Sequence, residues 1–268
     1  LFCHVSKNRE FGTIFKPGLW DFIILNLYKL GRMTPKTPTF RLAPWKWITI
    51  IWMTTVLVAG FAISIPRIPI LEESARNLFL HVPMWFTMMT MFAVGFFFSV
   101  KFLMSENLRD DQKASAATMV GIVFGVCGLL TGSLWARFTW GAWWILSEPK
   151  MNLAAMSMLL FVAYFLLRTA FDDPKTRARI SAIYNVFAVT SVPFLLYVIP
   201  RQLPSLHPGA EGNPAFSEIT APELRYIFYP AIIGFILVAM WLFTLTLRVR
   251  RVADALDVHS DNAHAHDE

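Results

Sequence analysis

Charged side chains are scarce in this 268-residue chain, since Lys, Arg, Asp and Glu together make up 16% of it. A soluble domain carries roughly a quarter charged residues, so the composition excludes an ordinary water-soluble globule. Cysteine is scarcer still, with Cys3 and Cys127 as the two examples. Two cysteines cannot build a disulfide framework or a thiolate cluster. Cys127 lies in an apolar run and is expected to be a small buried hydrophobe.

Apolar residues are abundant instead, at 56% of the chain, and the mean hydropathy is +0.50. This excludes a disordered chain, which needs low hydrophobicity. A helix crosses a bilayer with about 20 predominantly apolar residues. Six runs meet that length, at about 47–65, 79–104, 114–135, 151–171, 180–199 and 227–247. The sequence therefore predicts an all-α polytopic membrane protein with six transmembrane helices.

Basic residues are distributed unevenly between the two sides that these spans define. With alternating sides, eighteen of the 24 Lys and Arg residues fall on the side of the termini and six on the other. Positive charge favours the cytoplasmic side, so both termini are expected in the cytoplasm. The loops at about 66–78, 136–150 and 200–226 then face outward. The net charge of +6 is explained by topology rather than by nucleic-acid binding.

Three regions follow from this pattern. Residues 1–44 are predicted to be a cytoplasmic N-terminal extension with an amphipathic stretch at 19–30, suited to the membrane surface. Its first residues are polar and basic, so no cleavable signal peptide is expected. Residues 45–250 form the predicted six-helix domain, and 251–268 a polar C-terminal tail.

Tryptophan is concentrated in the outer loop at about 131–150. Trp135, Trp140, Trp143 and Trp144 fall within ten residues, with Gly141 among them. An interfacial aromatic belt accounts for one or two aromatics at each helix end. Four in one loop favour a flat aromatic platform for a ligand.

Histidine is also unevenly placed, because His81 and His207 are the two of six that lie outside the terminal regions. The predicted topology puts both on the outer face, beside the tryptophans. Pro83 suits the first turn of a helix, so His81 is expected at a helix N-terminus. Two imidazoles with apolar walls fit a bis-histidine haem iron and fit zinc poorly, since zinc takes three or four protein ligands.

Several short motifs together resemble the family of haem exporter protein C (CcmC) and its CcsA relatives in cytochrome c biogenesis. The resemblance runs from about residue 45 to the end of the sixth span. Its motifs are His81-Val82-Pro83, Thr131-Gly132-x-x-Trp135, Trp140-Gly141-x-Trp143-Trp144, Phe171-Asp172-Asp173 and Leu206-His207-x-Gly209.

This resemblance implies a haem-handling protein of the cytoplasmic (inner) membrane. His81 and His207 would be the axial ligands of a transient, non-covalent haem b, and the tryptophan loop would shield the macrocycle. Haem would pass to a periplasmic haem chaperone, with ABC transporter subunits of the maturation system nearby. No conventional catalytic site is implied, so an enzyme is not expected.

Charged residues of the outer loops complete the predicted site. Arg137, Lys150 and Arg201 are candidate partners of the haem propionates by charge-assisted hydrogen bonds. The family loop usually continues Trp-x-Trp-Asp, whereas here the further Trp is absent and the acid is Glu148. Glu148 is expected to supply that carboxylate next to the haem edge.

Two other functions remain open from the sequence. A membrane haem-binding electron carrier or quinol-reactive subunit would need histidine pairs inside the helices. A non-catalytic anchor or a transporter would leave the histidines without a role, although transporters tend to show repeats or broken helices.

Overall fold

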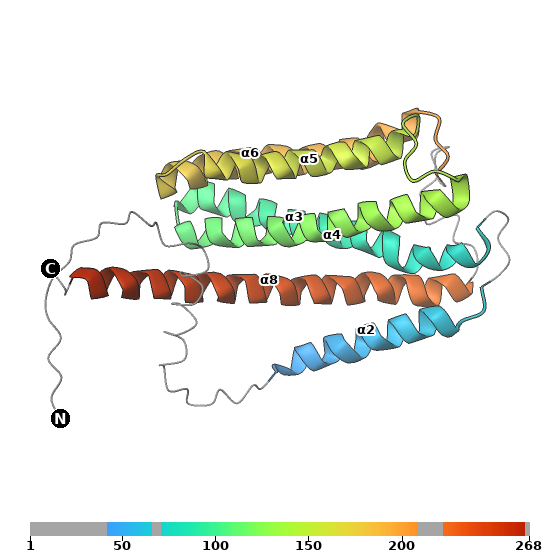
Figure 1. Ribbon diagram of the computed structural model, residues 1–268, viewed down its shortest axis with the longest axis horizontal. Helices are drawn as coiled ribbons and strands as arrows, with labels where there is room; N and C mark the ends of the chain where they lie inside the picture. The colour runs from blue at the N-terminus through green and yellow to red at the C-terminus, as the bar shows by residue number, and fades with distance from the viewer. Residues whose placement is uncertain (1–41, 66–70, 208–221, 266–268) are drawn as a thin grey trace, which may run out of the picture. The chain divides into compact units, whose positions relative to one another are not determined.

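The computed structural model describes residues 42–65, 71–207 and 222–265, and within these residues every regular element is helical (Figure 1). Six of the helices are long and apolar enough to cross a membrane, which confirms the all-α polytopic fold. The elements are α2 (Pro44–Ala62), η1 (Glu72–Asn77), α3 (Leu78–Ser105), α4 (Leu108–Trp140), α5 (Pro149–Thr169), α6 (Pro174–Pro193), η2 (Phe194–Val198), η3 (Pro200–Gln202) and α8 (Pro222–Ala265). The predicted amphipathic stretch at 19–30 lies outside the described residues.

Local sequence signals fix where three of the helices begin. Asn107, Glu148 and Asp173 precede α4, α5 and α6, and each side chain accepts a hydrogen bond from a backbone N–H of the first turn. Such caps satisfy N–H groups that have no partner within the helix. Pro149 and Pro174 then occupy the first helical position, where proline is tolerated best.

Three helices differ from the spans predicted from hydropathy. The third span was expected to end at Trp135, but α4 continues to Trp140, so half of the predicted tryptophan loop is helical. The fifth loses its regular α-helical pitch after Pro193 and continues as the wider turn η2, in which the Ile199 N–H donates to the Phe194 carbonyl. The sixth continues past its predicted end at residue 247 to Ala265.

The helices α3 and α4 lie at the centre, with α8 and α2 on one side and α5 and α6 on the other (Figure 1). One face of α4 carries glycines at every third or fourth position, Gly121, Gly125, Gly128 and Gly132. A Cβ on Gly128 would lie 2.9 Å from the Trp85 ring, and one on Gly132 2.6 Å from the His81 ring. This glycine stripe therefore receives side chains of α3 close to the backbone of α4.

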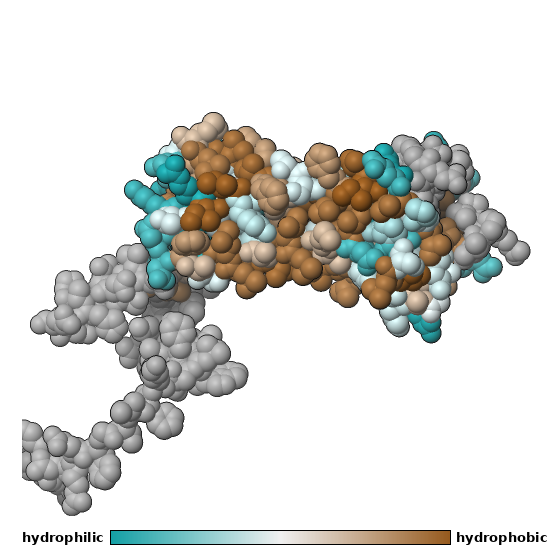
Figure 2. Space-filling view, turned by 90° about the horizontal axis from the view of Figure 1, so that it is seen from above, coloured by the Kyte–Doolittle hydropathy of each residue, from teal (hydrophilic) through white to brown (hydrophobic). Residues whose placement is uncertain are grey.

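The helix α8 is fixed to its neighbours near both ends. Trp52 of α2 donates its indole N–H to the Pro230 carbonyl over 2.9 Å. Toward the other end, Arg250 donates to the Gln112 carbonyl of α4 over 3.0 Å. The visible surface is apolar over the middle of the bundle and more hydrophilic toward both ends, as a bilayer requires (Figure 2).

Candidate functional site

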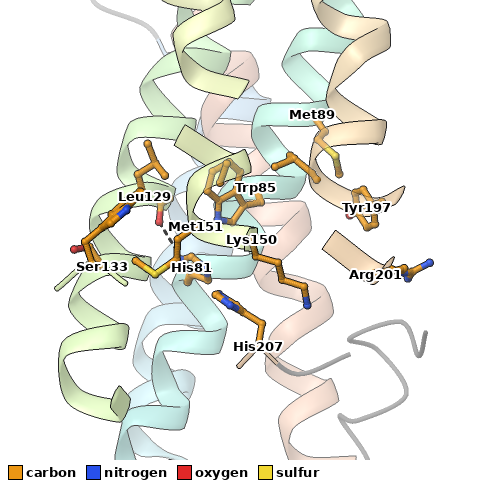
Figure 3. A pocket seen from close by; sticks show the side chains of 15 residues that line it. His81, Trp85, Met89, Leu129, Ser133, Lys150, Met151, Tyr197, Arg201 and His207 are labelled. Atoms are coloured by element: carbon orange, nitrogen blue, oxygen red, sulfur yellow. Dashed lines mark hydrogen bonds between the residues drawn. The ribbon is translucent and has the colours of Figure 1, made fainter. Parts of the chain in front are cut away.

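A cavity opens at the end of the bundle where α4 ends and α5 begins, which we call the site end (Figure 3). It lies between α3, α4, α5 and the segment that follows α6. Its lining residues are His81, Trp85, Met89, Gly128, Leu129, Gly132, Ser133, Trp144, Lys150, Met151, Ala154, Leu196, Tyr197, Arg201 and His207. The structure thus brings together the two histidines singled out from the sequence, which are 126 positions apart.

His81 lies on α3 and is oriented by α4. Its Nδ1 is 3.0 Å from the Gly128 carbonyl oxygen and 3.2 Å from Thr131 Oγ1 (Figure 3). A carbonyl can only accept, so Nδ1 carries the proton and Nε2 keeps its lone pair. The helix begins at Leu78 and is preceded by η1, so His81 is the fourth residue of α3 and not its N-terminus. The expectation that it starts the helix is wrong, because helical structure extends further upstream.

His207 lies beyond η3 and is oriented by Glu148. Its Nδ1 is 3.1 Å from Glu148 Oε1. A carboxylate only accepts, so here too Nδ1 is the donor. Both imidazoles line the same cavity. Each ring therefore has its Nδ1 bound to an acceptor, which leaves Nε2 as the nitrogen that could bind a ligand.

Glu148 is the N-cap of α5 and is buried, with 1% of its surface exposed. It accepts hydrogen bonds from Ser205 Oγ at 2.5 Å and from the Leu206 N–H at 2.7 Å, besides the one from His207. Burial would raise the pKa of the Glu148 carboxyl, but the hydrogen bonds from this segment, that of His207 foremost, outweigh it and lower the pKa to about 2. Glu148 is therefore a carboxylate at neutral pH.

The four tryptophans predicted to form one platform have different surroundings. Trp144 lines the cavity and donates its indole N–H to Asn152. Trp135 packs with its ring edge-on to His81, at 5.9 Å between centroids, and Trp140 packs in the same way against His207 at 4.9 Å. Trp143 is 58% exposed and is not among the described residues that line the cavity. Two of the tryptophans thus support the histidine rings.

The three basic residues predicted to pair with the haem propionates differ in whether they line the cavity. Lys150 and Arg201 line the cavity, and the Arg201 guanidinium lies 5.9 Å from the centre of the Tyr197 ring. Arg137 is exposed on the last turn of α4 and donates to the Gly141 carbonyl. It is not among the described residues that line the cavity.

Several residues that line the cavity were not predicted from the sequence. Trp85 lies four residues after His81 on the same face of α3, and its ring centroid is 6.2 Å from that of His81. That spacing was a usable signal. Leu196 and Tyr197 reach the cavity from η2. Their position depends on the wide turn after Pro193, which hydropathy does not register.

The arrangement suits an iron porphyrin better than a bare metal ion. Two imidazoles that bind through Nε2 can occupy the two axial positions of a haem iron. Among the described residues, no group of three or more His, Cys, Asp and Glu is placed to hold a metal ion, and zinc takes three or four such ligands. Aromatic and aliphatic side chains around the imidazoles supply apolar walls.

Several known proteins are similar in sequence to this chain. A family model described as heme exporter protein C matches residues 33–262. A protein named heme exporter protein C from Paracoccus denitrificans is 28% identical over 181 residues, 66% of this chain and 72% of the relative. One of the same name from Escherichia coli (strain K12) is 25% identical over 206 residues, which cover 76% of this chain and 82% of the relative. A cytochrome c biogenesis protein CcsA from Prochlorococcus marinus is 33% identical over 90 residues, which cover 34% of this chain and 28% of the relative.

Proposed function

Because this chain belongs to the family of heme exporter protein C, we propose that it handles haem for cytochrome c maturation. It binds haem b transiently and without a covalent bond, as cargo, and passes it to a periplasmic haem chaperone. The observation that carries this proposal is that His81 and His207 line one cavity, each held through Nδ1 by an acceptor.

The side chains of the cavity have distinct roles in this proposal. His81 and His207 bind the iron from opposite faces. Trp85 and Trp144 cover the macrocycle, because aromatic rings bury a large apolar area on contact. Lys150 or Arg201 pairs with the propionates by charge-assisted hydrogen bonds. The chain itself supplies orientation and polarity, with no conventional catalytic step.

The proposed location follows from the charges at the two ends of the bundle. The turn between α3 and α4, opposite the site end, lies among Lys101, Arg109 and Lys113. Positive charge favours the cytoplasmic side, so the site end faces the periplasm and both termini face the cytoplasm of the inner membrane. The ABC transporter subunits of the maturation system are its proposed neighbours.

The ligand assignment is tested on protein purified with haem. We expect the wild type to show the absorption spectrum of a low-spin, six-coordinate iron. His81→Ala and His207→Ala should each lose this signature, because each removes one axial nitrogen. If both variants keep the wild-type spectrum and haem content, neither histidine is a ligand.

The role of the cavity wall is tested with two adjacent tryptophans. Trp144 lines the cavity, whereas Trp143 is exposed and serves as its matched control. Trp144→Ala should speed haem loss to apomyoglobin in a stopped-flow assay, because it opens one wall. Trp143→Ala should behave as the wild type does. Equal rates for both variants would contradict the assignment.

A further inference from the structure

Glu148 connects the start of α5 to the segment that carries His207. Three consecutive residues, Ser205, Leu206 and His207, each donate one hydrogen bond to its carboxylate. Its position on α5 is fixed, because Glu148 Oε1 also accepts from the Lys150 N–H and caps the helix. One buried carboxylate thus holds a whole non-helical segment against a membrane helix.

The two histidines are held in different ways. The Nδ1 of His81 bonds to the backbone of α4, and its ring lies between Trp85 and Trp135. His207 lies outside any helix, and among the described residues the hydrogen bonds of 205–207 go to Glu148 or stay within the segment. Among the described residues, the hydrogen bond that orients the His207 ring therefore comes from Glu148 alone, and Trp140 packs edge-on against the ring at 4.9 Å.

We infer that Glu148 is a positioning residue that holds the His207 imidazole toward the cavity and thereby sets how long haem stays bound. This inference rests on the proposed function, in which His207 is an axial ligand. In this inference Glu148 acts through His207, and it is not among the described residues that line the cavity, whereas the sequence suggested a carboxylate next to the haem edge. A carboxylate on the far nitrogen of a ligating histidine fixes its tautomer and increases its donor strength.

The size of the effect follows from the behaviour of such partners in general. Loss of a residue that orients a metal ligand typically weakens metal binding about 10- to 100-fold. Loss of the carboxylate also weakens electron donation to ferric iron, so the reduction potential should rise. The His81 side is unaffected, so haem should stay attached by one ligand for part of the time.

The decisive variant is Glu148→Ser, because serine is a good N-cap but cannot reach the segment 205–207. Glu148→Gln is a second variant that keeps the size and one acceptor oxygen while removing the charge. The matched control is Asp173→Ser. Asp173 is likewise an acidic N-cap followed by proline, but it lies on α6, and its side chain accepts from the Thr176 N–H.

Haem dissociation, the visible spectrum and the reduction potential are measured on the purified holoprotein. Glu148→Ser should lose haem about 10-fold faster than the wild type, and part of its iron should become five-coordinate and high-spin. Added imidazole should restore the six-coordinate spectrum. Glu148→Gln should show a raised potential and a smaller rate change, whereas Asp173→Ser should match the wild type.

Two kinds of failure are distinguishable. If Glu148→Ser and Glu148→Gln both keep the wild-type spectrum, potential and dissociation rate, the positioning role is overturned while the proposed function stands. If the wild type lacks a bis-histidine spectrum, or His207→Ala retains it, the proposed ligand set itself fails. Should Glu148→Ser not fold, Glu148→Gln decides the question alone.

Discussion

Gly132 gives the His81 imidazole its room at the surface of α4. A Cβ at this position would lie 2.6 Å from His81 Cε1, closer than any real contact. The ring cannot simply move aside, because its Nδ1 is bonded to the Gly128 carbonyl. Gly132→Ala should therefore rotate or displace the imidazole and lower haem occupancy at least several-fold, measured as haem per protein after purification.

Gly60 provides the control for this prediction. A Cβ there would make ordinary contacts at 3.4 and 3.5 Å, and Gly60 lies inside α2. Gly60→Ala should leave haem occupancy unchanged and raise stability by up to about 1 kcal/mol, because alanine is the better helix former. If both variants retain full haem occupancy, the close contact at Gly132 does not matter for binding.

Residue types and charge distribution predicted part of the site. His81 and His207 could be singled out because the other four histidines lie in the terminal regions. Since successive loops alternate between the two sides of the membrane, the predicted topology put both histidines at one end of the bundle. The contacts of Glu148 could not be predicted, since Ser205 and His207 are 57 and 59 positions away and only the packing of α5 against η3 brings them near. Trp143 is next to Trp144 in sequence but is not among the described residues that line the cavity, because side chains of neighbouring residues can point in different directions.

At the scale of helices, a buried ion pair joins α4 to α5 at the end opposite the site. Arg168 donates to both carboxylate oxygens of Asp111, at 2.6 and 2.8 Å, and both side chains are largely buried. Removing one partner leaves a buried charge without its counterion. Arg168→Met should therefore destabilise the folded protein by about 3–5 kcal/mol, measured by unfolding in detergent micelles.

The ion pair between Glu106 and Arg179 at the surface is the control for the buried pair of Arg168 with Asp111. Its atoms are 3.9 Å apart and both side chains are about 70% exposed, so Arg179→Met should change stability little. The double variant Asp111→Leu with Arg168→Met should recover much of the loss, because no buried charge remains unpaired. An Arg168→Met protein as stable as Arg179→Met would contradict the role of the buried pair.

Hydropathy predicted the six spans but not the ends of the helices, because backbone hydrogen bonds do not require apolar side chains. The usable signal for α4 was Gly141, whose φ of +79° makes it the left-handed residue that ends the helix. For α6 the signal was Pro193, which lacks the N–H that a regular turn needs. The chain after Gly234 contains no Gly or Pro up to Ala265, which agrees with the unbroken α8.

For the molecule as a whole, the orientation in the membrane remains a prediction from charge. Leu146, at the site end, is 84% exposed, and Glu106 in the α3–α4 turn is exposed at the opposite end. In a background with Cys3 and Cys127 replaced, Leu146→Cys should react with a membrane-impermeant maleimide in intact spheroplasts. Glu106→Cys should react after permeabilisation only. Labelling of Glu106→Cys in intact spheroplasts would invert the topology.

The attachment of α8 near both ends has a consequence for the surrounding lipid. Sliding of this helix along the membrane normal would break the bond from Trp52 to Pro230 or the one from Arg250 to Gln112. A helix free of such bonds adjusts to a thin bilayer by tilting or shifting. Because these two bonds oppose such movement of α8, we expect a bilayer with short acyl chains to thicken around the protein instead.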